Sequence, residues 1–294
     1  MLKLIDGHTG FLELKTKVGV VINRKEAVII DSGVDENVGR KVLKALGGEF
    51  SIKAIFFTHS HADHYGGASF IRKRVGALTY APRIEACIIE NPIIEALEFS
   101  YAAVPLKTLL NKFICGEACE VDRSFSGGDE IEAVGLKFKV VDLPGHSVNH
   151  CGIVVGNTFY LGDSVFPYEV LEKYKIAYLH DPKKAIESLV KIKDVEVDNF
   201  LLYHGDLLSR SEIKSLISYN ISSINTILDV VYENACGSSF NQVVKTSLNS
   251  IGLKPKDLTE YYLLSSTLRG YLSCLVNEGK VSVALEDGEE KFYR

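Results

Sequence analysis

Short apolar runs separated by polar turns fill the first part of the chain, a pattern typical of β-strands. Between residues 10 and about 57 the apolar positions alternate or are continuous, and residues 52–57 have the character of a buried strand. Residues 36–46 interrupt this pattern with a mixture of charged and apolar positions that predicts a helix. Further strand–turn units are predicted from residue 135 to residue 160. This mixture of elements predicts an α/β fold.

A helix-like segment separates the two groups of predicted strands. Residues 83 to about 114 are rich in alanine, leucine, isoleucine, glutamate and lysine, with breaks at Pro92 and Pro105. We therefore predict two or three short helices inside an insert of about residues 83–127.

The composition changes again after about residue 210, where helices are predicted. Ser239 is placed to cap one helix, and residues 263–278 form another. Residues 279–294 read as a terminal hairpin with a turn at Asp287-Gly288. Helices followed by a two-stranded wing predict a small, winged-helix-like unit. We therefore divide the chain into residues 1–210 and 211–294.

The densest group of chemically active side chains follows the strand predicted at residues 52–57. His59, His61, Asp63 and His64 lie within six residues at the end of this strand. Imidazole and carboxylate groups are ligands that zinc and its neighbours accept. Four polar groups crowded at one strand end would otherwise each need a separate partner. The cluster therefore predicts a metal site.

Three further candidate ligands repeat the same local layout. His146, Asp163 and His204 each follow a short apolar strand, and each stands beside glycine or serine. Glycine lets the backbone turn tightly or approach another group closely. The repetition predicts that all three side chains belong to the site of the histidine cluster.

The complete set of motifs resembles the metallo-β-lactamase superfamily of metal hydrolases. The match covers roughly residues 10 to 210 and includes the first family motif, a strand at residues 27–33 that carries Asp31. The seven candidate ligands occur in the family's order: His59, His61, Asp63, His64, His146, Asp163 and His204. The resemblance implies a four-layer αββα sandwich of two mixed β-sheets with outer helices.

The resemblance also implies how the ligands are divided between two metal ions. His59, His61 and His146 would hold one divalent metal ion, while Asp63, His64 and His204 would hold a second. Asp163 would bridge both ions, and Asp31 would support the turn that carries the cluster. Zinc is the expected metal, with iron or manganese as alternatives.

Three imidazoles leave a coordination position for water, whose pKa zinc lowers to about 7. A hydroxide shared by the two metals would be the nucleophile. Asp63 is the expected catalytic residue, because it could orient the attacking oxygen or accept its proton.

These features lead us to expect a di-metal hydrolase of a small-molecule thioester, ester or lactone. The insert is hypothesised to cover the site and shape an apolar substrate pocket; core packing and a dimer contact are the alternatives. The winged-helix-like tail resembles that of single-strand endoribonucleases in this superfamily, so a phosphodiesterase is one alternative function. Another is a mono-iron persulfide dioxygenase, using the positions of His59, His146 and Asp163.

Charge argues against nucleic acid as the partner. The chain of 294 residues has a net charge of −5, and its seven basic residues from position 239 onward are balanced by seven acidic ones. Modules that bind nucleic acid normally carry a basic excess. Protein contact or a homodimer is the favoured role of the tail. The sequence has no signal-peptide-like start and no membrane-length apolar run, so we expect a cytoplasmic protein.

The remaining histidines and the cysteines have simpler interpretations. His8 lies in a polar turn and is expected to be exposed, and His150 is expected to be structural rather than to border the pocket. His180 precedes a predicted helix and is a weaker candidate for substrate contact. The six cysteines are expected to be reduced thiols, since the close pair Cys115 and Cys119 lacks nearby partners for a separate zinc site.

Overall fold

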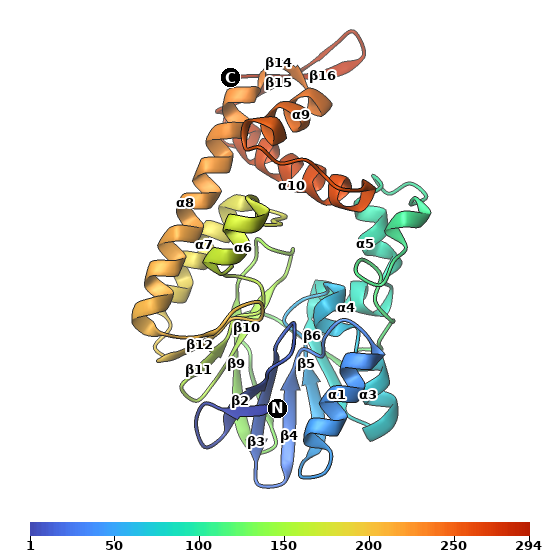
Figure 1. The fold of residues 1–294 in the computed structure, drawn as a ribbon, viewed down its shortest axis with the longest axis vertical. Helices are drawn as coiled ribbons and strands as arrows, with labels where there is room; N and C mark the ends of the chain where they lie inside the picture. The colour runs from blue at the N-terminus through green and yellow to red at the C-terminus, as the bar shows by residue number, and fades with distance from the viewer.

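The computed structural model describes residues 1–294, and two β-sheets form its centre (Figure 1). The first sheet is mixed: its first four strands pair antiparallel, and the pairs from β4 to β7 are parallel. Its seven strands, in spatial order, are β1 (Leu2–Leu4), β2 (Thr9–Leu12), β3 (Val18–Asn23), β4 (Glu26–Ile30), β5 (Ser51–Phe56), β6 (Leu78–Pro82) and β7 (Arg123–Phe125).

The second sheet has six strands and is also mixed. Its only parallel pair is β11 with β12. The spatial order is β13 (Leu207–Ser209), β12 (Asn199–Leu201), β11 (Thr158–Tyr160), β10 (Cys151–Val155), β9 (Leu136–Asp142) and β8 (Glu130–Ala133).

The sheets pack against each other through alternate side chains, as the strand period of two requires. On β4, Val28 and Ile30 enter the cluster between the sheets, whereas Ile29 faces the opposite side. Phe56 of the first sheet stacks on Phe138 of the second, with ring centroids 4.8 Å apart. A continuous aromatic and aliphatic core therefore fixes one sheet on the other.

Helices cover both outer faces. Against the first sheet lie α1 (Glu36–Leu46) and α3 (Ala68–Val75), which contribute Val42, Leu46 and Ile71 to its outer core. Against the second lie α7 (Pro182–Asp194) and α8 (Arg210–Asn234), with Leu189 and Leu216 in the same cluster as Phe159. The four-layer αββα prediction is confirmed.

Local capping chemistry explains the helix that the sequence predicted most accurately. The side chain of Asp35 accepts a hydrogen bond from the Val38 N–H and so caps the start of α1. Glu36 in the first turn and Lys44 in the last turn complement the helix dipole. The prediction of a helix at residues 36–46 is confirmed.

The insert forms the predicted short helices: α4 (Arg83–Glu90), α5 (Ile93–Glu98) and the 3₁₀ helix η1 (Lys107–Leu109). α4 ends before Pro92, because the residue before a proline is disfavoured in the helical conformation. The insert has a small core of its own, formed by Ala96, Phe99, Leu109 and Ile114. Three residues from elsewhere, Tyr178, Tyr262 and Leu263, pack against that core.

The C-terminal part consists of α8, α9 (Phe240–Ser250), α10 (Leu258–Asn277) and a sheet of three strands. The strands, in spatial order, are β14 (Cys236–Ser239), β16 (Glu289–Tyr293) and β15 (Ser282–Glu286). The predicted hairpin is confirmed: both turn residues, Asp287 and Gly288, have positive φ. The predicted capping role of Ser239 is also confirmed, because it forms a capping box with Gln242.

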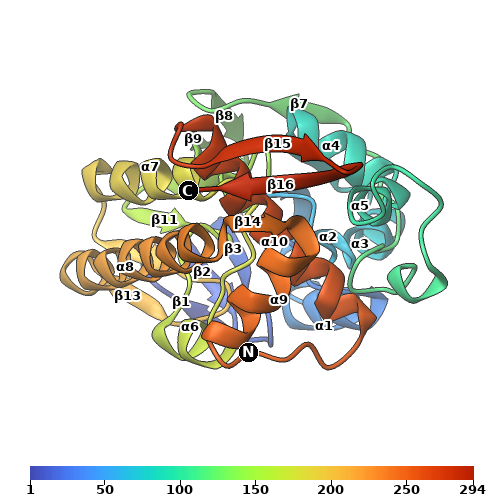
Figure 2. The same cartoon turned by 90° about the horizontal axis from the view of Figure 1, so that it is seen from above.

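The last long helix begins at Leu258, earlier than residue 263. The side chain of Asp257 accepts from the Glu260 N–H and so caps the start of the helix. α10 and the small sheet lie over one end of the sandwich (Figures 1 and 2). Side chains of α8 and α10 join the core cluster of the second sheet. The boundary at residue 210 and the winged-helix resemblance stay predictions.

None of the helices combines the length and the apolar character needed to cross a membrane.

Candidate metal centre

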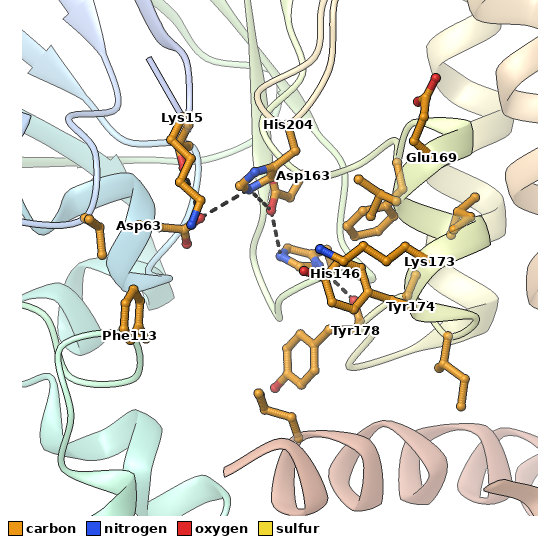
Figure 3. A pocket seen from close by; sticks show the side chains of 18 of the residues that line it. Lys15, Asp63, Phe113, His146, Asp163, Glu169, Lys173, Tyr174, Tyr178 and His204 are labelled. Carbon is orange, nitrogen blue, oxygen red and sulfur yellow. Dashed lines mark hydrogen bonds and ion pairs between the residues drawn. The ribbon is translucent and has the colours of Figure 1, made fainter. Parts of the chain in front are cut away.

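The seven predicted ligands come from four segments that follow strands. The first segment leaves β5 and continues into α2 (Ala62–Tyr65), which carries Asp63 and His64. His146, Asp163 and His204 follow β9, β11 and β12. Figure 3 shows Asp63, His146, Asp163 and His204 converging on one space.

Ligand atoms of these side chains come together in three overlapping groups, one of which, His59, His64 and Asp163, joins members of both expected sets. Ligand atoms of His59, His61 and His146 all lie within 4.8 Å of one another. Ligand atoms of Asp63, His64 and His204 meet the same criterion. Within the first set, His59 Nε2 and His61 Nδ1 are 3.0 Å apart.

Asp163 lies between the two sets. Its Oδ2 is 3.6 Å from His146 Nε2 and 3.2 Å from His204 Nε2. Its Oδ1 is 3.2 Å from His64 Nε2. One carboxylate therefore contacts members of both sets, which is the position that a bridging ligand requires.

Glycines shape two of the turns that present these side chains. Gly145, before His146, has φ +134°, and a Cβ there would lie 2.3 Å from the Ala185 nitrogen. Gly162, before Asp163, has φ +55°, and a Cβ there would lie 2.6 Å from His150 Nε2. Because both conformations favour glycine and both spaces are closed to a side chain, these positions fix how the next residue is presented.

Asp31 supports the cluster as predicted. This fully buried carboxylate accepts from the Thr58 N–H and the Thr58 hydroxyl, each at 2.8 Å, and lies 2.7 Å from His64 Nδ1. The His64 Nδ1–H therefore donates to Asp31, and Nε2 is left facing Asp163. The His64 ring also stacks on Tyr203, with centroids 5.4 Å apart.

Glu85 of α4 is a functional residue that the sequence interpretation missed. Its buried carboxylate accepts from the Ser60 N–H at 3.0 Å and from the Asn149 N–H at 2.8 Å. It also accepts from the hydroxyls of Ser60 and Ser147. One side chain thus joins the loop that carries His59 and His61 to the loop that carries His146.

Two other supporting groups were also missed. The His146 Nδ1–H donates to the Tyr178 carbonyl at 2.8 Å, which leaves Nε2 facing the site. Glu95 of α5 is buried, and its Oε1 lies 3.7 Å from His61 Nε2. Burial, together with the nearby Glu98 and Glu85, raises the pKa of Glu95 well above its usual value.

The first set of histidines is kept neutral. Burial, assisted by the neighbouring imidazoles, lowers the pKa of His59 well below its usual value. Burial lowers the pKa of His61 to about 3, and it also lowers the pKa of His146. Neutral imidazoles at neutral pH have lone pairs available for a cation.

The second set is arranged around negative charge. Burial opposes ionisation of Asp163, but the charges of His204 and His64 outweigh it and hold its pKa well below the usual range. The charge of Asp163 in turn raises the pKa of His204 to about 10, against the effect of burial. The buried carboxylates of this set therefore favour positive charge beside them, a role that metal cations can fill.

The other histidines and the cysteines follow the sequence interpretation in most respects. His150 is fully buried, and its Nε2 accepts from the Asp163 N–H at 3.1 Å, so its structural role is confirmed. His8 is exposed, as expected. His180 is exposed and does not line the cavity of the site. All six cysteines are free thiols.

The family is decided by a sequence comparison. The model of the metallo-beta-lactamase superfamily matches residues 13–218. The chain belongs to this superfamily. The match includes all seven candidate ligands, and the resemblance inferred from the motifs is confirmed.

Among curated superfamily relatives, the chain is similar to hydroxyacylglutathione hydrolases. It is 25% identical over 195 residues to hydroxyacylglutathione hydrolase 1 of Vibrio vulnificus, a match covering 64% of this chain and 65% of that protein. It is 26% identical over 142 residues to the hydroxyacylglutathione hydrolase of Dechloromonas aromatica, covering 48% of this chain and 41% of the relative. The chain thus spans less than two thirds of the length of either relative.

Solved structures extend the shared fold beyond the matched residues. A beta-lactamase domain protein from Burkholderia ambifaria covers 100% of this chain and 94% of its own, with a TM-score of 0.75 and 16% identity. A metallo-beta-lactamase family protein from Thermus thermophilus covers 95% of this chain and 93% of its own, with a TM-score of 0.71 and 16% identity. At this identity the likeness concerns the fold alone, and it includes the C-terminal helices.

The residues of this superfamily member fit divalent metal ions. His64 Nε2, His146 Nε2 and Asp163 Oδ1 are buried without a hydrogen-bond partner. Buried polar atoms are normally satisfied, so unpartnered ones need an explanation. All three atoms belong to the candidate ligand sets, and imidazole with carboxylate is a donor set suited to zinc and similar ions.

A cavity of about 740 Å³ opens beside the metal-site residues, within the usual size range of small-molecule sites. Asp63, His146, Asp163 and His204 form part of its wall. From the insert, only Phe113 lines the cavity. Most of the remaining wall comes from α6 (Tyr168–Tyr174), the loop after it and α10. The hypothesis that the insert covers the site stays a prediction.

Proposed function

We propose that this chain is a hydrolase that holds two divalent metal ions and cleaves a small-molecule thioester, ester or lactone. His59, His61 and His146 are assigned to one ion, and Asp63, His64 and His204 to the other. Asp163 is shared. The observation that carries the proposal is the position of Asp163, within 3.6 Å of His146 and within 3.2 Å of both His64 and His204.

When bound, the metal ions would supply an activated water molecule and polarise the substrate carbonyl. Hydrolysis adds this water oxygen to the carbonyl carbon, breaks the bond from that carbon to sulfur or oxygen, and moves a proton to the leaving group. The chain's residues must therefore position the water and accept its proton.

We assign to Asp63 the role of accepting the proton of the attacking water. Its side chain is 33% exposed and lines the cavity, unlike the fully buried His64 beside it. Its Oδ2 lies 3.2 Å from His204 Nε2 and accepts from the Thr16 hydroxyl at 3.3 Å. Its charge is preserved, because the charge of His64 and the hydrogen bond from His204 outweigh the effect of burial and lower the pKa of Asp63.

The curated relatives support the thioester class. Both proteins named above are hydrolases of hydroxyacylglutathione by name. The cavity volume of about 740 Å³ also suits a small molecule.

A substrate panel tests the proposal. The metal-reconstituted full chain would be assayed with thioesters, lactones, phosphodiesters and single-stranded RNA, beside Asp63→Asn and the exposed control Asp194→Asn. We expect hydrolysis of carbonyl substrates that falls roughly 10²-fold or more in Asp63→Asn and is unchanged in the control. Cleavage of RNA alone would replace the proposal with the endoribonuclease alternative, and one iron per chain with oxygen uptake would favour the dioxygenase.

A further inference from the structure

The two walls of the cavity differ in chemistry. The wall from the first half of the chain has four apolar residues, Leu14, Val34, Val38 and Phe113, but it also contains Lys15 and Lys41, and its only acidic residue is the candidate ligand Asp63. The opposite wall is mostly apolar, with ten hydrophobic residues: Phe166, Val170, Leu171, Tyr174, Ile176, Ala177, Tyr178, Leu253, Leu263 and Leu264. The candidate metal ligands lie between the two walls (Figure 3).

The apolar wall is formed by parts of the chain distant in sequence. α6 and the loop after it provide Val170, Tyr174 and Ile176, and α10 provides Leu263 and Leu264. Tyr174 is 45% exposed. An exposed aromatic ring beside several leucines offers apolar surface that a ligand can cover.

The two lysines of the first wall are free to meet an anion. Lys15 and Lys41 are exposed, and neither forms an ion pair, although many other lysines of the chain do. Figure 3 shows Lys15 extending into the cavity from the side of Asp63. The charged residues of the apolar wall are Glu169 and Lys173 on α6 and Glu260 on α10, so that wall has more acidic than basic residues.

From this asymmetry we infer the class of substrate, an inference that rests on the proposed function. The cavity takes an ester or thioester whose apolar acyl group lies against α6 and α10. The leaving group carries a carboxylate or phosphate that Lys15 and Lys41 attract. The scissile carbonyl then lies between the walls, beside Asp63 and Asp163.

The expected preferences follow from the chemistry of each wall. Burying one methylene group stabilises a complex enough to raise kcat/KM roughly fourfold, so activity should rise along an acyl series until the cavity is filled. An exposed lysine close to an anionic group of the substrate should raise kcat/KM roughly two- to fivefold, and salt should weaken this electrostatic contribution.

The test uses acetyl, butyryl, hexanoyl and octanoyl thioesters of 3-mercaptopropionate, which is anionic, and of N-acetylcysteamine, which is neutral. With the metal-loaded full chain we expect kcat/KM to rise with acyl length on both thiols. We also expect a preference for the anionic thiol that disappears at high salt.

Matched variants assign each preference to its wall. Tyr174→Ser and Leu263→Ser should reduce the increase with acyl length, whereas Tyr232→Ser, on α8 and outside the cavity, should not. Lys15→Gln and Lys41→Gln should reduce the preference for the anionic thiol, whereas Lys44→Gln, an exposed lysine of the same helix as Lys41, should not. Circular dichroism of each variant verifies that it is folded.

The outcomes separate this inference from the proposed function. Hydrolysis that is insensitive to acyl length and to leaving-group charge would overturn the inference and leave the hydrolase proposal standing. Failure to hydrolyse any thioester, ester or lactone would overturn the hydrolase proposal itself.

Discussion

Removing the Glu85 carboxylate should both destabilise the protein and weaken the metal site. In the native structure this buried side chain accepts two backbone N–H groups and two hydroxyls, from Ser60, Ser147 and Asn149. Hydrogen bonds to a charged group contribute about 1.5–3 kcal/mol each, and a buried donor left unsatisfied costs a similar amount. The hydroxyls can rotate toward other acceptors, whereas the two N–H groups cannot. We therefore expect Glu85→Ala to lower the free energy of unfolding by about 4 kcal/mol.

Urea unfolding in the presence of a chelator measures this loss without the stability that bound metal adds. Glu85→Gln should lose about half as much, because its amide oxygen still accepts while its NH₂ faces two donors. Glu187→Ala, an exposed position on α7, is the control and should change stability by less than about 0.5 kcal/mol. Metal affinity of Glu85→Gln should also fall, roughly 10-fold or more. A change below about 1 kcal/mol in Glu85→Ala would refute the view that this residue holds the two ligand loops together.

Two further predictions concern other buried groups. Glu95→Gln should weaken metal binding roughly 10- to 100-fold, because a metal ion beside His61 would favour ionisation of the Glu95 carboxyl group and an amide cannot ionise; a metal titration that gives equal affinities for this variant and for the exposed control Glu187→Gln would contradict the assignment. A thiol reagent at pH 8 should label the exposed Cys87 and Cys236 quickly and leave Cys119 and Cys151 unreacted until the chain unfolds. Burial raises the pKa of Cys119 to about 11 and also raises that of Cys151, so both stay protonated below those values; rapid labelling of all six thiols would show that the two buried sites are open.

The features that local sequence determines were predictable. The strand before His59, the helix capped by Asp35 and the hairpin turn at Asp287 all depend on neighbouring residues. The candidate ligands were found because each follows a strand and stands next to a small residue, a layout visible over a few positions.

The features that depend on packing between distant segments were not predictable in the same way. Glu85 lies 25 positions from Ser60 and 64 from Asn149, and nothing beside it in sequence indicates either partner. The apolar wall was expected from the insert, yet most of it comes from α6 and α10. In the sequence, their apolar residues cannot be distinguished from ordinary core residues, and only the fold brings them close to Asp163.

The central claim is that two metal ions share Asp163. Metal content by mass spectrometry, measured with turnover on the purified full chain, tests it in the natural sequence and in two variants. We predict two divalent ions per chain in the natural protein, chiefly the loss of the second ion in His204→Ala, and loss or scrambling of both in Asp163→Ala. Normal metal content and turnover in Asp163→Ala would contradict the account.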